Sequence, residues 1–330
     1  GLVDVPSGTL AAAALAEHGL ARRSFSPTAL QHYAACPYRF YLSALLKLSP
    51  REEPSPLEEL DPLQRGTLVH ETQYTLLTRL RDEGLLPLDE DRLPRAGELL
   101  EACLDEVAKR HEDALCPAIP RVWEDGLSEV RADLREWLRR TAMDSVWSPT
   151  HFELSFGLVE HDEGRDAASV KEPVELACGL RVRGSIDLVE TRRSDGALRA
   201  TDHKTGKVRA SDGDVVKGGT ILQPALYALA VESLLPGRPV VGGRLYYCTS
   251  TGDYTAIDVP LDAVTRDAVA TVVSAVDDAL GRGLLPAAPA KDACKYCDYR
   301  PVCGPYEEIR VRTKRDARAL PLLAKVRGLA

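Results

Sequence analysis

The stretches GSIDLV, residues 184–189, and TDHKTGK, residues 201–207, are separated by a polar turn at Ser194-Asp195-Gly196. The first stretch is rich in isoleucine, leucine and valine and poor in residues that favour a helix, so it predicts a β-strand. The turn between the two stretches indicates that the chain reverses direction there. The sequence therefore predicts a β-hairpin, and the remaining elements are interpreted around it.

Side chains on a strand alternate between the two faces of its sheet. Asp202 and Lys204 are two residues apart and are therefore expected on one face, with His203 on the other. If Asp187 of the neighbouring strand points to the face of Asp202, the hairpin presents two carboxylates and one lysine together. Such a group suits a hard divalent cation and the water molecule that the cation activates.

The composition is that of a globular protein, with 44% hydrophobic and 28% charged residues among 330. This length suffices for one domain with an insertion or for two domains. The sequence contains no apolar run long enough to cross a bilayer, and residues 11–15 lack the flanks of a signal peptide. We therefore expect a soluble, cytoplasmic protein with no membrane partner. The first residue is glycine rather than methionine, which is consistent with a piece of a longer polypeptide.

A formal net charge of -8 and an isoelectric point near 5.5 argue against a nucleic-acid partner, because phosphate binding needs clustered cations. The distribution of charge weakens this objection. Basic residues gather in the central segment and in the tail: Arg181, Arg183, Arg192, Arg193, Arg199, Lys204, Lys207 and Arg209, then Arg310, Arg312, Lys314, Arg315, Arg318, Lys325 and Arg327. The charge pattern thus permits DNA as a partner.

Hydrophobic periodicity and turn residues predict a mixed order of helices and strands. Helices are expected at 24–48, from residue 65, within 89–146, at 220–235 and at 262–280, and strands at 151–160, 174–182, 184–191, 197–204, 240–248 and 254–259. This order predicts a mixed α/β fold with a small sheet, flanking helices and a helical insertion. We divide the chain into an N-terminal segment (1–50), a helical subdomain (51–148), a core (149–260) and a C-terminal segment (261–330).

Three cysteines near the C-terminus, Cys294, Cys297 and Cys303, follow a C-x2-C-x5-C spacing. In a long chain without a signal peptide, such closely spaced thiols indicate a metal site more often than disulfides. Three ligands leave a four-coordinate zinc or iron–sulfur site one ligand short. No histidine follows Cys303, so we expect the fourth ligand to be Cys36. The other four cysteines lie in helix or strand patterns and are expected to be buried thiols: Cys103, Cys116, Cys178 and Cys248.

Six elements occur in a fixed order along the chain. They are Cys36 within a Cys-Pro-aromatic-Arg-Phe segment, Gly66-x-x-x-His70, Gly184-x-Ile186-Asp187, Asp202-x-Lys204-Thr205-Gly206, Gln223-x-x-x-Tyr227 and the C-x2-C-x5-C group. With this set the sequence resembles the PD-(D/E)XK nucleases of the RecB and AddB type, over approximately residues 26–306. The resemblance implies a restriction-endonuclease-like core and a cysteine-ligated C-terminal segment.

The resemblance also implies roles for individual residues. It makes His70, Asp187 and Asp202 ligands of Mg²⁺ or Mn²⁺, Lys204 the catalytic lysine, Gln223 and Tyr227 a helical motif beside the catalytic site, and Cys36, Cys294, Cys297 and Cys303 the ligands of a 4Fe-4S cluster. Four thiolates suit zinc as well as iron, and the family likeness alone favours the cluster. Because the cluster ligands come from both ends of the sequence, we expect it to clamp the chain into one long loop.

The function implied by the resemblance is that of a metal-dependent DNA nuclease, an exonuclease acting on single strands or duplex ends. The sequence lacks the G-x-x-x-x-G-K-[ST] phosphate loop of a motor. We therefore expect the nuclease domain of a helicase-nuclease in DNA end processing and recombinational repair, with the helicase motor in the same chain or a partner chain. The alternatives are a stand-alone exonuclease of the CRISPR-adaptation type and a catalytically inactive DNA-binding or scaffold module of the same fold.

Overall fold

A five-stranded mixed sheet forms the centre of the computed structural model, which describes residues 15, 17–49, 59–158, 165–313 and 320–330. The strands are arranged in the order β1 (Trp147–Phe156), β4 (Gly184–Arg192), β5 (Leu198–Lys204), β6 (Val240–Tyr247) and β7 (Ala256–Pro260). Neighbouring strands are antiparallel except for β5 and β6, which are parallel. The predicted mixed α/β fold is confirmed.

The predicted hairpin is present as β4 and β5, with Leu188 opposite Thr201. Its turn is held by the Asp195 carboxylate, which accepts a hydrogen bond from the backbone N–H of Ala197 at 3.1 Å. Strand β5 then leads into helix α7 (Gln223–Leu234) and back into β6. Parallel strands need such a crossover connection, and the helix covers the face of the sheet that it crosses.

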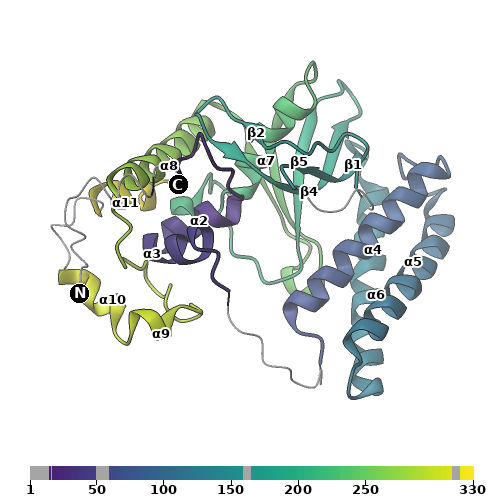
Figure 1. The fold of residues 1–330 in the computed structure, drawn as a ribbon. Coiled ribbons are helices and arrows are strands. Elements are labelled where there is room, and N and C mark those ends of the chain that lie inside the picture. The colour runs from purple at the N-terminus through teal and green to yellow at the C-terminus, as the bar shows by residue number, and fades with distance from the viewer. Residues whose placement is uncertain (1–14, 16, 50–58, 159–164, 314–319) are drawn as a thin grey trace.

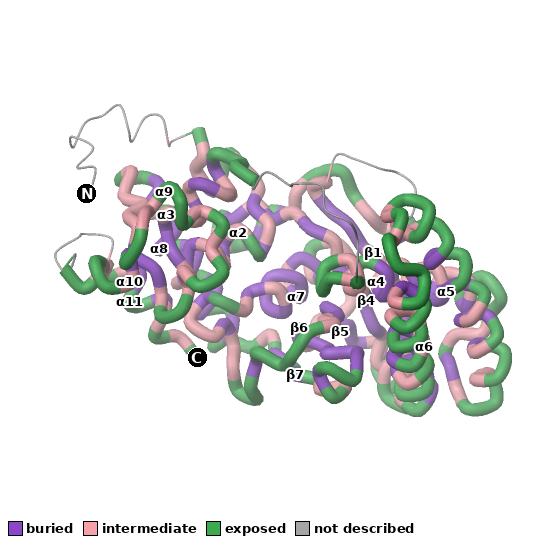
Figure 2. The backbone as a smooth tube through the Cα atoms, turned by 90° about the horizontal axis from the view of Figure 1, so that it is seen from below, coloured by how far each residue is buried: buried purple, intermediate pink, exposed green. Residues whose placement is uncertain are grey.

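Helices cover both faces of the sheet and form two separate hydrophobic cores (Figure 1). One core joins the sheet to α2 (Pro27–Ala35), α7, α8 (Ala263–Arg282) and α11 (Leu320–Arg327). The other joins it to α4 (Pro62–Asp82), α5 (Leu93–Leu115) and α6 (Pro120–Met143). In Figure 2 the strands and α7 are mostly buried, whereas α6 exposes one side. The three helices of the second core, α4–α6, fall within residues 51–148, where the sequence predicts a helical subdomain.

The prediction of one continuous helix over 24–48 is wrong, because the helix is interrupted at Cys36. Helix α2 ends at Ala35, Cys36 has extended φ/ψ angles of -167° and 118°, and α3 (Pro37–Phe40) begins directly after it. Proline disfavours helical geometry in the residue that precedes it, which accounts for the break. A π-helical turn, Tyr41–Leu45, follows α3. Cys36 is thus the C-cap of α2 and the N-cap of α3.

Other boundaries also differ from those expected. Strand β1 begins at Trp147 rather than at residue 151, and the strand expected over 174–182 is a two-stranded hairpin, β2 (Val174–Glu175) with β3 (Arg181–Val182). The remaining short elements are α9 (Arg300–Cys303), α10 (Glu307–Arg310) and 3-10 turns at Lys217–Gly219, Ser250–Gly252 and Val311–Thr313. Part of the basic tail, residues 314–319, lies outside the described residues, as do residues 50–58.

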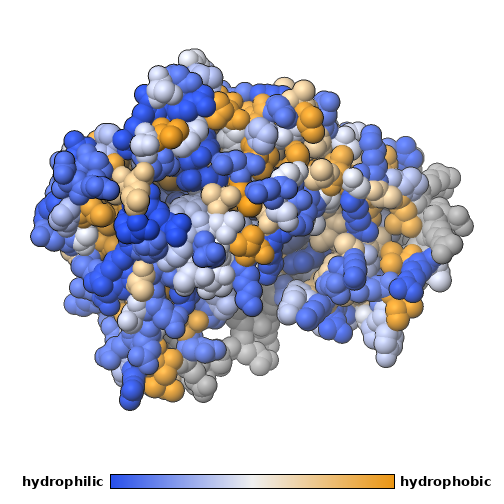
Figure 3. Space-filling view, turned by 180° about the vertical axis from the view of Figure 1, so that it is seen from behind, coloured by the Kyte–Doolittle hydropathy of each residue, from blue (hydrophilic) through white to orange (hydrophobic). Residues whose placement is uncertain are grey.

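Among the helices that the structure describes, none combines the length and apolar character needed to cross a membrane. On the face shown in Figure 3, hydrophobic residues lie interspersed among hydrophilic ones.

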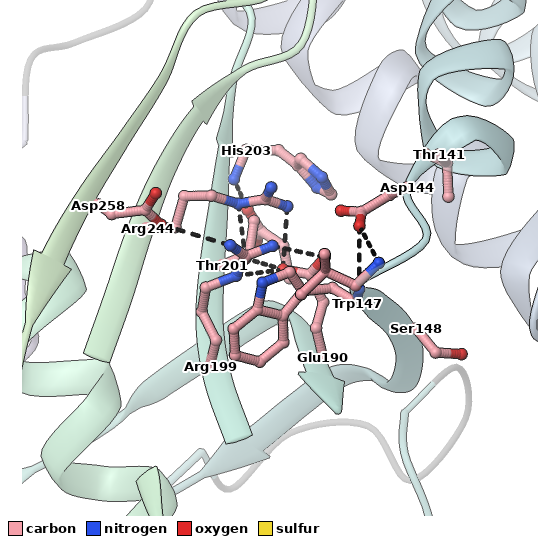
Figure 4. A network of polar contacts seen from close by, with 12 residues as sticks. Thr141, Asp144, Trp147, Ser148, Glu190, Arg199, Thr201, His203, Arg244 and Asp258 are labelled. Atoms are coloured by element: carbon pink, nitrogen blue, oxygen red, sulfur yellow. Dashed lines mark hydrogen bonds and ion pairs between the residues drawn. The ribbon is translucent and has the colours of Figure 1, made fainter. Parts of the chain in front are cut away.

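A buried polar network fixes β4, β5 and β6 to one another on the face covered by α4–α6 (Figure 4). The Glu190 carboxylate accepts two hydrogen bonds from the Arg199 guanidinium, at 3.0 and 3.1 Å, and pairs with Arg244 at 2.9 Å. It also accepts the Thr201 hydroxyl at 2.5 Å. Burial alone would raise the pKa of Glu190, but Arg244 and Arg199 outweigh burial and lower it to about 2. The network therefore stays ionised and holds β5 in register.

Helix α7 approaches β6 so closely that Gly243 has no room for a side chain. A Cβ atom at Gly243 would lie 2.1 Å from the carbonyl oxygen of Pro224. We expect Gly243→Ala to lower the free energy of unfolding by about 1–3 kcal/mol, because the helix must move. Gly97→Ala, in the interior of α5 with no atom within 4 Å of the added Cβ, should instead raise it by about 0.5–1 kcal/mol. Urea unfolding measures both, and equal midpoints for the two variants would contradict this packing.

Candidate active site

Acidic and basic side chains from the sheet and from α4 converge beside β4 and β5. The Asp187 Oδ1 lies 3.5 Å from the His70 Nδ1, and its Oδ2 accepts the backbone N–H of His203 at 2.6 Å. On β5, the Lys204 ammonium pairs with the Asp202 Oδ2 at 2.6 Å. The structure thus brings His70 to Asp187 and Lys204 to Asp202.

Helix α4 carries His70 to the sheet. Its start is fixed by a capping box, in which the Asp61 side chain accepts from the backbone N–H groups of Leu63 and Gln64. One turn before His70, a Cβ atom at Gly66 would lie 3.4 Å from the Thr205 Oγ1. The glycine thus lets α4 pass close to the loop after β5, which explains its place in the Gly-x-x-x-His segment.

A third carboxylate, Glu153 of β1, belongs to the site and was missed in the sequence analysis. His70, Glu153 and Asp187 each offer a ligand atom, and these atoms lie within 4.8 Å of one another. Glu153 has φ 50°, which is rare for a residue within a strand, and its Oε2 accepts the Ser185 hydroxyl at 2.7 Å. Its sequence signal is an acidic residue in the strand HFELSF, which pairs with the strand of Asp187.

Asp202 is not one of the three residues whose ligand atoms all lie within 4.8 Å of one another. Its Oδ2 pairs with Lys204 instead. Burial and the nearby Asp187 raise the pKa of Asp202 to about 6. Burial and Asp187 likewise raise the pKa of Glu153 to about 7. Each carboxylate thus resists ionisation beside the charge of Asp187, and a divalent cation would relieve this repulsion.

His70 and Asp187 stabilise each other as an ion pair. Burial opposes ionisation of both groups, but their attraction outweighs it. The pKa of Asp187 is lowered to about 2 by His70, and the pKa of His70 is raised to about 9 mainly by Asp187. In this form the imidazole is a cation, so a metal ion that binds to it must displace a proton.

Helix α7 closes the site from the side of Gly184. Gln223 is its first residue, and Tyr227 follows one turn later. A Cβ atom at Gly184 would lie 3.2 Å from the Tyr227 hydroxyl, so the glycine makes room for this ring. Burial, with Asp202 and Asp187 nearby, raises the pKa of Tyr227 far above its usual value, and the hydroxyl keeps its proton. The predicted motif therefore lies close to the carboxylates.

His203 points away from the carboxylates, as the alternation of strand side chains predicts. Its ring lies 5.9 Å from that of Trp137 and 5.8 Å from that of Tyr246, centroid to centroid. Burial lowers the pKa of His203 to about 3, so the ring is neutral. It contributes to the site through its backbone N–H, which holds Asp187.

The four cysteines of the predicted cluster, Cys36, Cys294, Cys297 and Cys303, line one cavity of about 370 Å³. Burial raises the pKa of Cys36, although backbone N–H groups at Arg39, Tyr38 and Ala288 oppose that shift by favouring the thiolate. Burial and Glu308 raise the pKa of Cys294 to about 11. The chain thus brings a thiol from residue 36 to the three at its far end.

The spacing of these sulfurs bears on the choice of metal. A tetrahedral zinc with bonds of about 2.3 Å holds its sulfurs about 3.8 Å apart. No three of the four sulfurs, all on described residues, lie within 4.8 Å of one another. An iron–sulfur cluster binds each cysteine to a separate iron and holds the sulfurs further apart than a zinc ion does. Among the other cysteines, Cys116 is exposed at the end of α5, and the expectation that it is buried is wrong.

Residues 24–304 match the model of the PD-(D/E)XK nuclease superfamily, and the chain belongs to this superfamily. The family resemblance found in the sequence is thereby confirmed. The sheet with its converging carboxylates is consistent with this class of nuclease.

Proteins similar to this chain include two kinds. The chain is 36% identical over 152 residues, 45% of its length, to a CRISPR-associated exonuclease Cas4/endonuclease Cas1 fusion of Myxococcus xanthus. It is 30% identical over 239 residues (67%) to an ATP-dependent helicase/deoxyribonuclease subunit of Pelotomaculum thermopropionicum, and 28% over 325 residues (89%) to the corresponding subunit of Symbiobacterium thermophilum. The matches cover 26%, 19% and 26% of these relatives.

The charge state of His70 predicts how metal binding depends on pH. Between pH 7, where Glu153 ionises, and pH 9, where His70 does, we expect Mn²⁺ affinity to rise about tenfold per pH unit, because one proton leaves on binding. In His70→Ala the affinity should rise less steeply, because only the carboxyl groups, whose pKa values His70 lowers in the wild type, then release protons in this range. Calorimetry in buffers of different ionisation enthalpy counts the released protons. Equal proton release by the two proteins would contradict a role for His70 as ligand.

Proposed function

We propose that this chain is a metal-dependent deoxyribonuclease that hydrolyses phosphodiester bonds. The observation that carries the proposal is the convergence of His70, Glu153 and Asp187, with the Asp202–Lys204 pair beside them. Membership of the PD-(D/E)XK superfamily supports it independently. An inactive scaffold of the same fold would need none of these side chains in this arrangement.

Each residue takes a role that follows from its position. His70, Asp187 and Asp202 hold Mg²⁺ or Mn²⁺, with Glu153 as a further oxygen ligand; the carboxylates suit Mg²⁺ and the imidazole makes Mn²⁺ a good substitute. When bound, the metal lowers the pKa of its water and neutralises charge on the phosphate. Lys204, held by Asp202, orients the attacking water. Gln223 and Tyr227 support the carboxylates from α7.

The biological setting is proposed from the relatives. Two of them are named as subunits of an ATP-dependent helicase/deoxyribonuclease, and their matches cover 67% and 89% of this chain. We infer an exonuclease that acts on DNA strands or duplex ends with a helicase motor, in end processing and recombinational repair in the cytoplasm. The stand-alone CRISPR-adaptation exonuclease is the second candidate, favoured by the 36% identity to the Cas4 fusion over 152 residues.

The C-terminal segment is proposed to hold a 4Fe-4S cluster on Cys36, Cys294, Cys297 and Cys303. Their shared cavity and the spacing of their sulfurs support this assignment. Ligation would join residues separated by almost the whole domain, and closing so long a loop restricts the unfolded chain strongly. The cluster is therefore assigned a structural role.

Cleavage of end-labelled single- and double-stranded DNA tests the nuclease. Asp202→Asn and Lys204→Ala should each reduce the rate with Mg²⁺ at least about a hundredfold, because metal binding or water orientation is lost. DNA affinity should change little, since phosphates are bound mainly by other basic residues. Asp195→Asn, in the exposed turn of the same hairpin, is the control and should keep the wild-type rate. Wild-type turnover in Lys204→Ala would refute the assignment.

Iron and sulfide analysis with visible absorbance tests the cluster. Anaerobically purified protein should contain up to about four irons per chain and show broad sulfur-to-iron charge-transfer absorbance, as expected for one cubane cluster. Cys36→Ser should lose both signals and unfold at a lower urea concentration. Cys116→Ser, whose thiol is exposed and outside the cavity, should keep both. Colourless protein with one zinc per chain would contradict the cluster and assign the four cysteines to a zinc site.

A further inference from the structure

A second cavity, of about 400 Å³, lies on the face of the sheet opposite to Asp202 and Lys204, between the strands and α6. Its volume falls in the range of small-molecule sites, about 300–1,000 Å³. Four aromatic rings line it, namely Trp137, Trp147, Tyr246 and Tyr254. Its lining residues include none of the four cysteines and none of His70, Glu153 and Asp187, and it adjoins the metal site at His203, whose ring lies 6.2 Å from that of His70.

The side chains around this cavity are arranged as cation–aromatic layers. The Arg140 guanidinium lies 4.6 Å from the centroid of the Tyr254 ring, and that of Arg244 lies 4.8 Å from Tyr246. Arg199, from the polar network of Figure 4, lies 4.2 Å from the Trp147 ring. These cation–π contacts hold the guanidiniums against the rings, while the guanidinium nitrogens also pair with Glu136, Glu190 and Asp258. These aromatic and arginine side chains offer flat surfaces on which a planar ligand could stack.

Charges in and around the cavity nearly balance. Arg139 and Arg140 pair with Glu136, while Arg199 and Arg244 share Glu190, with Asp258 3.4 Å from Arg199. The Asp144 Oδ1 accepts the backbone N–H groups of Val146 and Trp147. Because these charges are paired, the interior of the cavity offers little electrostatic attraction to a small anion. A neutral ring system binds by stacking and does not need that attraction. The partly exposed Arg139 and Arg140 can meet an anionic group that stays towards the solvent.

One polar atom on this cavity has no partner among the residues that the structure describes. His203 lines the cavity, is 3% exposed, and its Nε2 makes no hydrogen bond to them. A buried polar atom of this kind costs free energy unless a ligand or water satisfies it. Figure 4 shows His203 on the sheet and Asp144 at the end of α6 on the same side of the network. Together they offer polar groups to the edge of a planar heterocycle.

We propose that this cavity is a second binding site, for the base of one nucleotide, with the phosphate at Arg139 and Arg140 on the rim. Aromatic and arginine surfaces bind nucleobases by stacking, at about 1–3 kcal/mol per base. The site goes beyond the proposed nuclease chemistry and does not depend on it, because it lies across the sheet from the carboxylates. The nucleotide is either free or a unit of a single strand, and both present the same base and phosphate.

Calorimetric titration in EDTA tests the site, with dAMP, a short oligothymidylate and deoxyribose 5-phosphate as probes. We expect dAMP, the oligonucleotide or both to bind, and the sugar phosphate, which lacks a base, to bind at least about tenfold more weakly. Binding of dAMP identifies a site for free nucleotides, and binding of the oligonucleotide alone identifies a site for a strand. Equal binding of the sugar phosphate, or no binding of dAMP and oligonucleotide, would overturn the proposal.

Variants locate the binding in the cavity. Ala256→Trp places a large side chain into it from an exposed position on β7 and should weaken binding at least about tenfold. Arg140→Gln should weaken binding of dAMP or the oligonucleotide several-fold, because the phosphate loses a cation on the rim. Arg135→Gln, on the same helix but outside the cavity, should leave this binding unchanged. Glu153→Gln, which alters the metal site at a residue that does not line the cavity, should bind as the wild type does. Loss of binding in Glu153→Gln with full binding in Ala256→Trp would assign the nucleotide to the metal site instead.

Discussion

The central interaction of this structure is the repulsion among Glu153, Asp187 and Asp202, which the fold must offset to hold these carboxyl groups side by side. The three carboxylates come from adjacent strands and share the cations His70 and Lys204. Asp187 stays ionised beside His70, and its charge raises the pKa of the other two carboxyl groups. Such a gathering of carboxylates is costly without a cation, which supports the proposed metal site.

The rest of the fold keeps these groups in place. Arg65 of α4 pairs with the buried Asp133 of α6, and Asp133 in turn accepts the backbone N–H of Ser250 and the Tyr254 hydroxyl. This chain of contacts ties the helix that carries His70 to the end of the sheet. On the same side, Glu190 holds β5 in register through two arginines. The helices α4–α6 thus position His70, the proposed metal ligand, as well as covering the sheet.

Much of this arrangement could be predicted from local sequence. The hairpin and the shared face of Asp202 and Lys204 follow from alternation and turn residues, and the order of motifs led to the right superfamily. Glu153 could not be found in this way, because only the pairing of β1 with β4 brings it to Asp187. The break at Cys36 is readable from Pro37, but the helical pattern on both sides of it favours one continuous helix. The second cavity depends on side chains from α6 and all five strands of the sheet, whose juxtaposition no local pattern encodes.

The most direct test of the central claim is a crystal structure of the protein with Mn²⁺, in which anomalous scattering locates the metal. We expect one or two ions within about 2.0–2.4 Å of Asp187, Asp202 and His70, with Glu153 contributing an oxygen directly or through water. Asp202 must then turn from Lys204 to the metal. A fully occupied Mn²⁺ site elsewhere, with Asp187 still paired to His70 and Asp202 still paired to Lys204, would contradict the account.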